Sequence, residues 1–197
     1  MSAESRARTS VMLALLAACL IVTPATAQRQ MEILNRGVVA IHGGDGKVYV
    51  GWRLLGSDPA DIAFNLYREA GGAAPKKLND RPLTETTDYV DADVDLSAPV
   101  SYFVRPVLNG SEGEASDSFT LPANPPAQPY LSIPLQTPEG CTPNDASVGD
   151  LDGDGDYDIV LHQAPRGRDN SQAGITGQPI FEAYKLDGTF LWRINLG

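Results

Sequence analysis

Short apolar runs separated by turn-forming residues follow one another along most of the chain. Residues 47–55 alternate between apolar and polar side chains well enough for a half-buried strand. The preceding residues 43–46, Gly-Gly-Asp-Gly, predict a turn that allows positive φ angles. Residues 62–68 alternate in the same way. This pattern predicts short β-strands joined by tight turns.

More strands are predicted between residues 100 and 121. Residues 100–107 are largely apolar, Asn109-Gly110 is a strong signal for a hairpin turn, and residues 116–121 supply the returning strand. Two sheets built from such strands resemble a fibronectin type III module, with Trp52 as the core aromatic residue. We expect this module to have a structural or substrate-orienting role rather than a binding surface of its own.

A proline-rich segment, residues 122–129, follows that module and predicts a stiff linker. Beyond it we expect an irregular stretch through Cys141, a strand that ends at Gln163, and a hairpin that turns at Asp187-Gly188. Strand, loop, strand, tight turn and strand are the parts of one β-propeller blade. One blade cannot bury both of its faces, so we expect an incomplete ring and the amino-terminal part of a longer protein.

Composition favours an all-β chain, and charge narrows its partners. The 197 residues include 19 Gly and 15 Pro, and the length allows one or two domains. The formal charge is −10, without the basic stripe that a phosphate backbone requires, so no nucleic-acid partner is expected. The predicted fold is a fibronectin III-like β-sandwich followed by about one propeller blade. The predicted divisions are a signal peptide at 1–27, the sandwich at 28–121, the linker at 122–129 and the start of the propeller domain at 130–197.

The first 27 residues have the features of an export signal. Two arginines precede the apolar run Val11–Val22, and Ala25-Thr-Ala27 offers a small-residue cleavage site. The run is too short to span a membrane, so we expect a secreted protein, extracellular or periplasmic. Lipoprotein anchoring through Cys19 is the less favoured alternative, because the sequence after Cys19 continues apolar.

Five aspartates alternate with small or apolar residues after the linker. They are Asp150, Asp152, Asp154, Asp156 and Asp158. So many like charges within nine residues repel one another unless a cation gathers them. Calcium, which takes about 6–8 oxygen ligands, suits such a loop better than magnesium. We predict a calcium site with all five as ligands. The alternative is a solvated acidic turn, because Asp and Gly also favour turns without metal.

Several runs in both halves of the chain resemble one known family. They are residues 51–59, 62–68, 102–107, 144–155, 169–172 and 183–193. These runs look like the rhamnogalacturonan lyases of polysaccharide lyase family 11. The resemblance implies a secreted, calcium-dependent enzyme with an amino-terminal β-sheet module and an eight-bladed β-propeller. It also implies cleavage of rhamnogalacturonan I, a pectin backbone, between rhamnose and galacturonic acid by β-elimination.

Within that resemblance, Asn144 matches a substrate-contact position just ahead of the acidic loop. Its amide can donate to one sugar oxygen and accept from a hydroxyl, although a turn residue bonded to its own backbone is an equal alternative. The chain departs from the family at Ala164, where relatives carry a carboxylate expected to contact sugar. We favour a structural role for His162 over a catalytic one. Arg166 and Arg168 are assigned to a solvated loop rather than to uronate binding, and no catalytic residue is assigned.

The implied chemistry requires a cation. The carboxylate beside C5 of galacturonate opposes loss of the C5 proton, and a metal on that carboxylate stabilises the charge that develops. The five aspartates would coordinate a calcium ion within their own loop. We therefore expect that ion to have a structural role rather than to contact substrate. The expected partner is pectic polysaccharide, with no membrane span and a monomeric state, and the fragment alone is expected to be inactive. Two other hypotheses stay open: a calcium-dependent carbohydrate-binding or adhesion module without catalysis, and an inert spacer.

Overall fold

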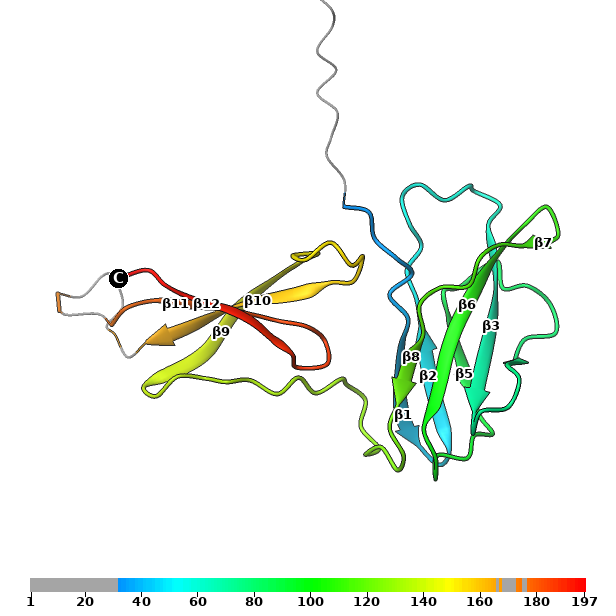
Figure 1. Ribbon diagram of the computed structural model, residues 1–197, viewed down its shortest axis with the longest axis horizontal. Coiled ribbons are helices and arrows are strands. Elements are labelled where there is room, and N and C mark those ends of the chain that lie inside the picture. Colours follow the sequence, from blue (N-terminus) through cyan, green and yellow to red (C-terminus); the bar gives the residue numbers. More distant parts are fainter. Residues whose placement is uncertain (1–31, 166, 168–172, 175–176) are drawn as a thin grey trace, which may run out of the picture. The chain divides into compact units, whose positions relative to one another are not determined.

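All regular structure in the described residues is β-structure (Figure 1). The computed structural model describes residues 32–165, 167, 173–174 and 177–197. The first strands are β1 (Val39–Gly44), β2 (Lys47–Gly51), β3 (Ala63–Ala70), β4 (Lys76–Lys77), β5 (Asp88–Asp91), β6 (Val100–Leu108), β7 (Ser111–Glu112) and β8 (Phe119–Leu121). After the linker come β9 (Cys141–Gly149), β10 (Asp158–Pro165), β11 (Ile180–Tyr184) and β12 (Phe190–Asn195). The all-β fold class is confirmed for these residues. The predicted signal peptide, Cys19, Arg166, Arg168 and residues 169–172 lie outside them.

The first eight strands form two antiparallel sheets. One has the order β1-β2-β5, and the other has the order β4-β3-β6-β7 with β8 also paired to β6. Apolar side chains from both sheets meet in one buried core: Val38, Ala40, Val48, Val50, Trp52, Phe64, Leu66, Val100, Tyr102, Val104 and Leu121. Burying such a side chain contributes about 1.5–3 kcal/mol, so this core is the main source of the module's stability. Trp52 lies edge-on to Phe64 with a centroid distance of 5.6 Å, which confirms it as a core aromatic residue.

In this module the predicted hairpin turn was correct, whereas the predicted end of a strand was not. Asn109 and Gly110 have φ angles of 52° and 76°, as the predicted hairpin turn requires. The strand predicted at 47–55 was too long, because β2 ends at Gly51. Its end is set by a change of backbone partner: the Arg53 amide donates to Arg36 O at 2.7 Å instead of continuing the sheet.

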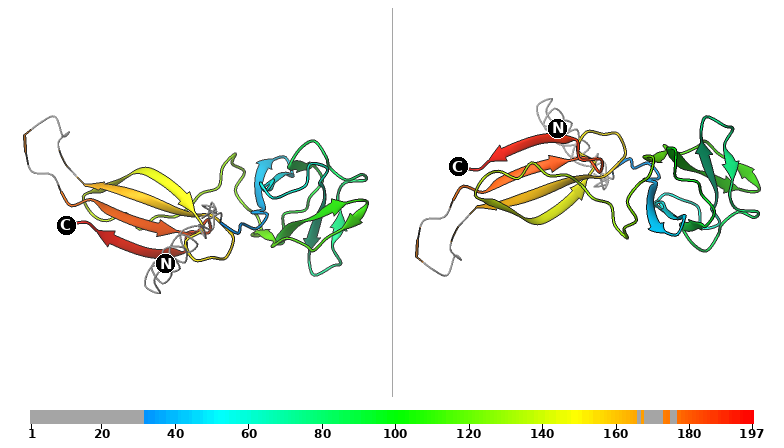
Figure 2. Two further views of the ribbon diagram at one scale, coloured as in Figure 1. Left: turned by 90° about the horizontal axis from the view of Figure 1, so that it is seen from above. Right: turned by 90° about the horizontal axis from the view of Figure 1, so that it is seen from below.

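The last four strands form a separate antiparallel sheet with the order β12-β11-β10-β9, seen side by side in Figure 2. The prediction of irregular structure through Cys141 was wrong at its end, because β9 begins at that residue. This strand is exposed along most of its length and contains Pro143, Asn144 and Asp145, which gave no strand signal. Its pairing with β10 holds it in the sheet. The sheet therefore has four strands, one more than the pattern predicted.

The turn between β11 and β12 offers a test of how closely the chain packs there. Gly188 has a φ angle of 88°, and a Cβ atom there would lie 2.4 Å from Pro134 Cγ. We expect Gly188→Ala to destabilise the chain by roughly 1–3 kcal/mol, because it combines backbone strain with a collision. Gly110→Ala is the matched control, since its φ is also positive but nothing lies within 4 Å. Urea unfolding should show the larger loss for Gly188→Ala; equal losses would mean that Pro134 gives way without cost.

Candidate metal centre

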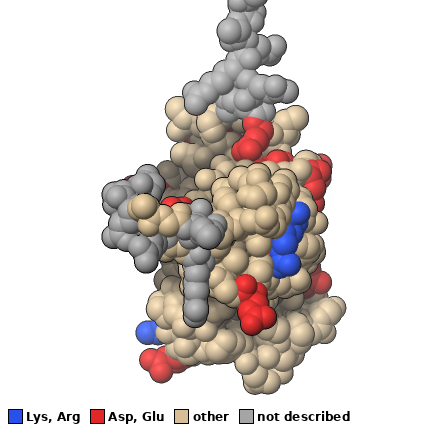
Figure 3. Space-filling model, turned by 90° about the vertical axis from the view of Figure 1, so that its left-hand side faces the viewer, with Lys and Arg blue, Asp and Glu red and all other residues tan. Residues whose placement is uncertain are grey.

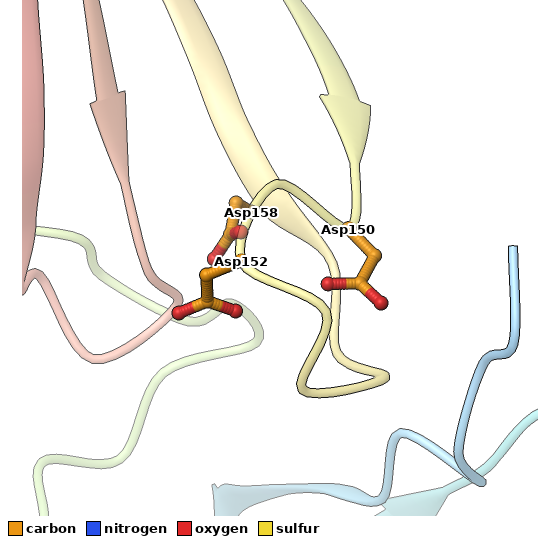
Figure 4. A group of neighbouring side chains, drawn as sticks. All are labelled: Asp150, Asp152 and Asp158. Atoms are coloured by element: carbon orange, nitrogen blue, oxygen red, sulfur yellow. The ribbon is translucent and has the colours of Figure 1, made fainter.

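The acidic loop is the hairpin connection between β9 and β10 (Figure 4). Gly149 pairs with Asp158 at its base, so the register of the two strands brings Asp150 and Asp158 close together. Gly153 and Gly155 have φ angles of 81° and 87°, a backbone conformation that L side chains rarely adopt. The glycines let the chain turn sharply enough for successive carboxylates to face one another.

Three of the five predicted ligands are brought together. Asp150, Asp152 and Asp158 each offer a carboxylate oxygen within 4.8 Å of the others (Figure 4). Asp158 is 1% exposed, and the other two are more accessible. A donor set of carboxylate oxygens suits a hard divalent cation, whose remaining ligands can be backbone carbonyls or water. Asp154 and Asp156 lie outside this group.

Backbone amides orient these carboxylates. Both oxygens of Asp150 accept hydrogen bonds, from Gly153 N at 2.7 Å and from Gly155 N at 3.0 Å. Asp158 Oδ2 accepts from Leu151 N at 2.9 Å. Each carboxylate oxygen can accept more than one bond, so these contacts leave lone pairs for a cation. The loop's own hydrogen bonds therefore hold the ligand group together.

The electrostatics of the loop also favour a cation. Burial raises the pKa of Asp158, an effect that the Leu151 amide opposes and the negative charge of Asp152 reinforces. Lys185 places Nζ 2.6 Å from Asp152 Oδ2 and 2.6 Å from Asp154 Oδ2. These two carboxylates raise the pKa of Lys185, and its ammonium lowers the pKa of Asp154. A positive charge thus already bridges two of the aspartates.

Lys185 should compete with a metal ion at this loop. We expect Lys185→Gln to bind calcium about 5-fold more tightly or better, because an ammonium ion beside the site repels a divalent cation and holds two carboxylate oxygens. Calorimetric titration with calcium at fixed ionic strength measures the change. Lys76→Gln, at an exposed lysine of β4, is the control for overall charge. Weaker binding by Lys185→Gln would show instead that the ammonium orients Asp152 and Asp154 for the metal.

A cavity of about 570 Å³ opens beside the loop. Its acidic lining residues are Asp117, Asp154, Asp156, Asp158 and Asp187. Lys185 also lines it, together with Asn35 and Gly37 from the segment that precedes β1. This volume falls within the range of small-ligand sites. With so many carboxylates, the cavity suits a cation, or a sugar bound through one, better than a free anion.

The other predicted site residues lie elsewhere on the second sheet. Asn144 is exposed on β9, and its contact with sugar stays a prediction. His162 stacks on Phe181 of β11 with ring centroids 5.1 Å apart, a packing contact that accords with the favoured structural role.

In the described part of the face drawn in Figure 3, basic side chains form only small separate groups. The described residues contain no helical segment with the length and apolarity that a membrane crossing requires.

Sequence reasoning missed a buried polar cluster in the same sheet. Glu182 is fully buried and accepts hydrogen bonds from Gln163 Nε2 at 2.6 Å, Tyr184 OH at 2.7 Å and Arg193 Nε at 2.6 Å. Burial by itself raises the pKa of Glu182, but these three donors together hold it below its usual value. Tyr184 OH in turn accepts from Gln136 N. Glu182 pairs with Arg193 across the two strands, but the register shifts between Ala183 and Tyr184, so no regular count from the turn predicts this pair.

Comparisons with known proteins identify the family. A family model described as "Rhamnogalacturonan I lyases beta-sheet domain" matches residues 29–121, and one described as "Rhamnogalacturonan lyase family 11, C-terminal domain" matches residues 130–197. The chain is 48% identical over 182 residues to rhamnogalacturonan endolyase YesW of Bacillus subtilis, and 42% identical over 181 residues to rhamnogalacturonan exolyase YesX of the same organism.

A solved structure agrees with these matches. The Bacillus licheniformis rhamnogalacturonan lyase PL11 superposes with a TM-score of 0.72 at 49% identity, over 86% of this chain and 29% of that one. The match to YesW covers 87% of this chain and 27% of YesW. The match to YesX covers 86% of this chain and 28% of YesX. The chain belongs to the rhamnogalacturonan lyases of polysaccharide lyase family 11, and it spans little more than a quarter of the length of these relatives.

Proposed function

We propose that the intact protein is a rhamnogalacturonan I lyase, which cleaves pectin between rhamnose and galacturonate by calcium-dependent β-elimination. The observation that carries this proposal is the 48% identity to an endolyase that extends over both parts of the chain. The names of YesW and YesX give the substrate class, rhamnogalacturonan, and both endo and exo modes occur among these relatives.

The two parts of the chain have different roles in this proposal. The two-sheet module, which we take as fibronectin III-like, supports or orients the substrate. The four-stranded sheet is one blade of a β-propeller in the intact protein, and Asn144 on its exposed strand contacts sugar. The edge strands of this sheet are β9 and β12, and both carry exposed residues. One blade cannot bury its own faces, and stacking against neighbouring blades would bury them.

Asp150, Asp152 and Asp158 hold a calcium ion in this proposal, and the ion is structural. The ion neutralises three carboxylates that would otherwise repel one another and fixes the connection between β9 and β10. β-Elimination itself needs a cation on the galacturonate carboxylate, where it stabilises the charge that develops as the C5 proton leaves. Secretion through the segment at 1–27 and action as a monomer complete the proposal.

The test is an assay of the complete protein on rhamnogalacturonan I. Formation of an unsaturated uronate product, followed by its ultraviolet absorbance, should require calcium and stop when a chelator is added. Residues 1–197 alone should give no product. Binding of the polysaccharide by the complete protein without any product would replace the lyase proposal with that of a carbohydrate-binding module.

A further inference from the structure

Arg53 reaches from the two-sheet module to the acidic loop. It lies two residues beyond the end of β2, directly after Trp52, and Glu32–Gly197 form one compact unit. Its Nη1 donates to Gly155 O at 3.0 Å, and its guanidinium lies over the Tyr157 ring, 4.3 Å from the centroid. Nη1 also lies 3.7 Å from Asp156 Oδ1. One side chain therefore contacts three consecutive residues of the loop, Gly155–Tyr157.

The segment before β1 holds the same loop through its backbone. Asn35 N donates to Gly155 O at 2.9 Å, so that carbonyl accepts from both Asn35 and Arg53. Asp150 N donates to Glu32 Oε1 at 3.1 Å at the other end of the loop. Asn35 Oδ1 accepts from Arg53 Nη1 at 3.2 Å. These contacts join the segment, Arg53 and the loop into one hydrogen-bonded cluster.

Two glycines leave room for the contacts of this cluster. A Cβ atom at Gly155 would lie 3.0 Å from Asn35 N, and Gly155 also has a positive φ of 87°. A Cβ atom at Gly37 would lie 2.3 Å from Arg53 Cζ. Glycine on both sides of the contact lets the backbones and the guanidinium approach this closely. The fit is therefore built from both partners and does not depend on one long side chain alone.

We propose that Arg53 is a positioning residue for the metal centre, which makes the two-sheet module part of the calcium site. The inference rests on the proposed calcium site at Asp150, Asp152 and Asp158. Arg53 acts on the loop through a carbonyl, a ring and Asp156, and none of these belongs to the three-aspartate group. It fixes the loop without occupying the ligand oxygens of that group.

Two effects of Arg53 on metal affinity have opposite signs. A clamped loop loses less conformational freedom when the cation binds, which strengthens binding. The positive guanidinium repels the cation, which weakens binding. Asp156 and the face of the Tyr157 ring offset that positive charge. The positioning effect therefore dominates, and by linkage calcium strengthens the contact between loop and module by the same factor.

The test is calorimetric calcium titration of this chain with Arg53→Met, which removes the hydrogen bonds and the charge but keeps an apolar stem. We expect about 10-fold weaker binding. Arg53→Lys retains the charge but not the planar fork, so it should restore affinity only in part. Arg105→Met is the matched control, since Arg105 Nη1 also donates to a backbone carbonyl, Gly113 O, at 3.0 Å within the module. It should bind as the unchanged chain does.

Tyr157→Leu gives an independent test if Arg53→Met does not fold. It removes the ring under the guanidinium and should weaken calcium binding in the same direction. Amide exchange at Gly153 and Gly155 without metal should be faster in both variants, which a mere loss of charge would not cause. If Arg53→Met binds calcium as tightly as the unchanged chain, or more tightly, the positioning role is wrong and the calcium site stands. If the unchanged chain binds no calcium, the proposed calcium site and the positioning role of Arg53 both fail.

Discussion

Asp158→Asn is expected to weaken calcium binding by roughly 100-fold or more, while the metal-free chain becomes no less stable. Asparagine keeps an oxygen that can accept the Leu151 amide, which donates to Asp158 Oδ2 at 2.9 Å. It removes the charge of the most buried member of the three-aspartate group. Burial raises the pKa of Asp158, which means that the environment disfavours its ionised form when no metal compensates. The substitution should therefore change metal affinity and metal-free stability in opposite directions.

Calorimetric titration with calcium and thermal unfolding in a chelator together measure these two effects. The thermal midpoint of the unchanged chain should rise when calcium is added, and that of Asp158→Asn should not. Asp145→Asn, at an exposed carboxylate of β9, is the control and should leave calcium affinity close to that of the unchanged chain. A metal-free Asp158→Asn chain that melts well below the unchanged chain would contradict the argument from burial.

The sequence was sufficient to predict the acidic loop but not which aspartates gather. Alternation of Asp with Gly indicated a turn rich in oxygen ligands, and the structure has that turn between β9 and β10. The spacing of the five aspartates does not distinguish those that gather at the metal site from those that do not. Lys185, far along the chain, lies against Asp152 and Asp154, and Arg53 lies against Asp156. Contacts between residues so distant in sequence depend on tertiary packing, and no local pattern in a single sequence indicates them.

The fold could be predicted where local signals are strong. Asn109-Gly110 and Asp187-Gly188 marked turns because few residues adopt positive φ angles, and Trp52 was large enough to indicate a core. Strand β9 was missed because it has neither alternation nor β-branched residues along most of its length, and pairing with β10 holds it. The end of β2 was also missed, since the backbone partner of Arg53 is Arg36, which lies in another segment.

The buried glutamate was missed for a related reason: the apolar pattern of residues 180–186 predicts a hairpin strand but does not indicate which of its side chains face inward. Glu182 lies in the middle of that strand, opposite Arg193. A buried carboxylate is stable only when donors surround it, and its donors come from three different strands, β10, β11 and β12. Only the pairing of all three strands shows that the charge is satisfied. The cluster therefore links correct folding of this sheet to one side chain.

Glu182→Gln should destabilise the chain by about 3 kcal/mol, the low end of the range for breaking a buried ion pair, because Arg193 is 39% exposed and can rehydrate. Gln163 Nε2 and Tyr184 OH donate to one carboxylate oxygen, and Arg193 Nε donates to the other. A glutamine has an NH₂ group on one side, so in either orientation it places a donor against a donor. The loss comes from charge and hydrogen bonding, since the shape of the side chain is nearly unchanged.

The pH dependence separates this explanation from a packing defect. The pKa of Glu182 is lowered in the folded chain from its usual value of about 4.5, so its ionised form adds stability above that value. That stability is lost as the pH falls through the lower folded pKa. The difference between the two chains in urea unfolding should therefore be full near pH 7 and shrink in that acidic window. Glu139→Gln, at an exposed carboxylate, is the control and should unfold like the unchanged chain throughout. A gap that stays constant from pH 7 down through that window would contradict the role of the charge and indicate altered packing.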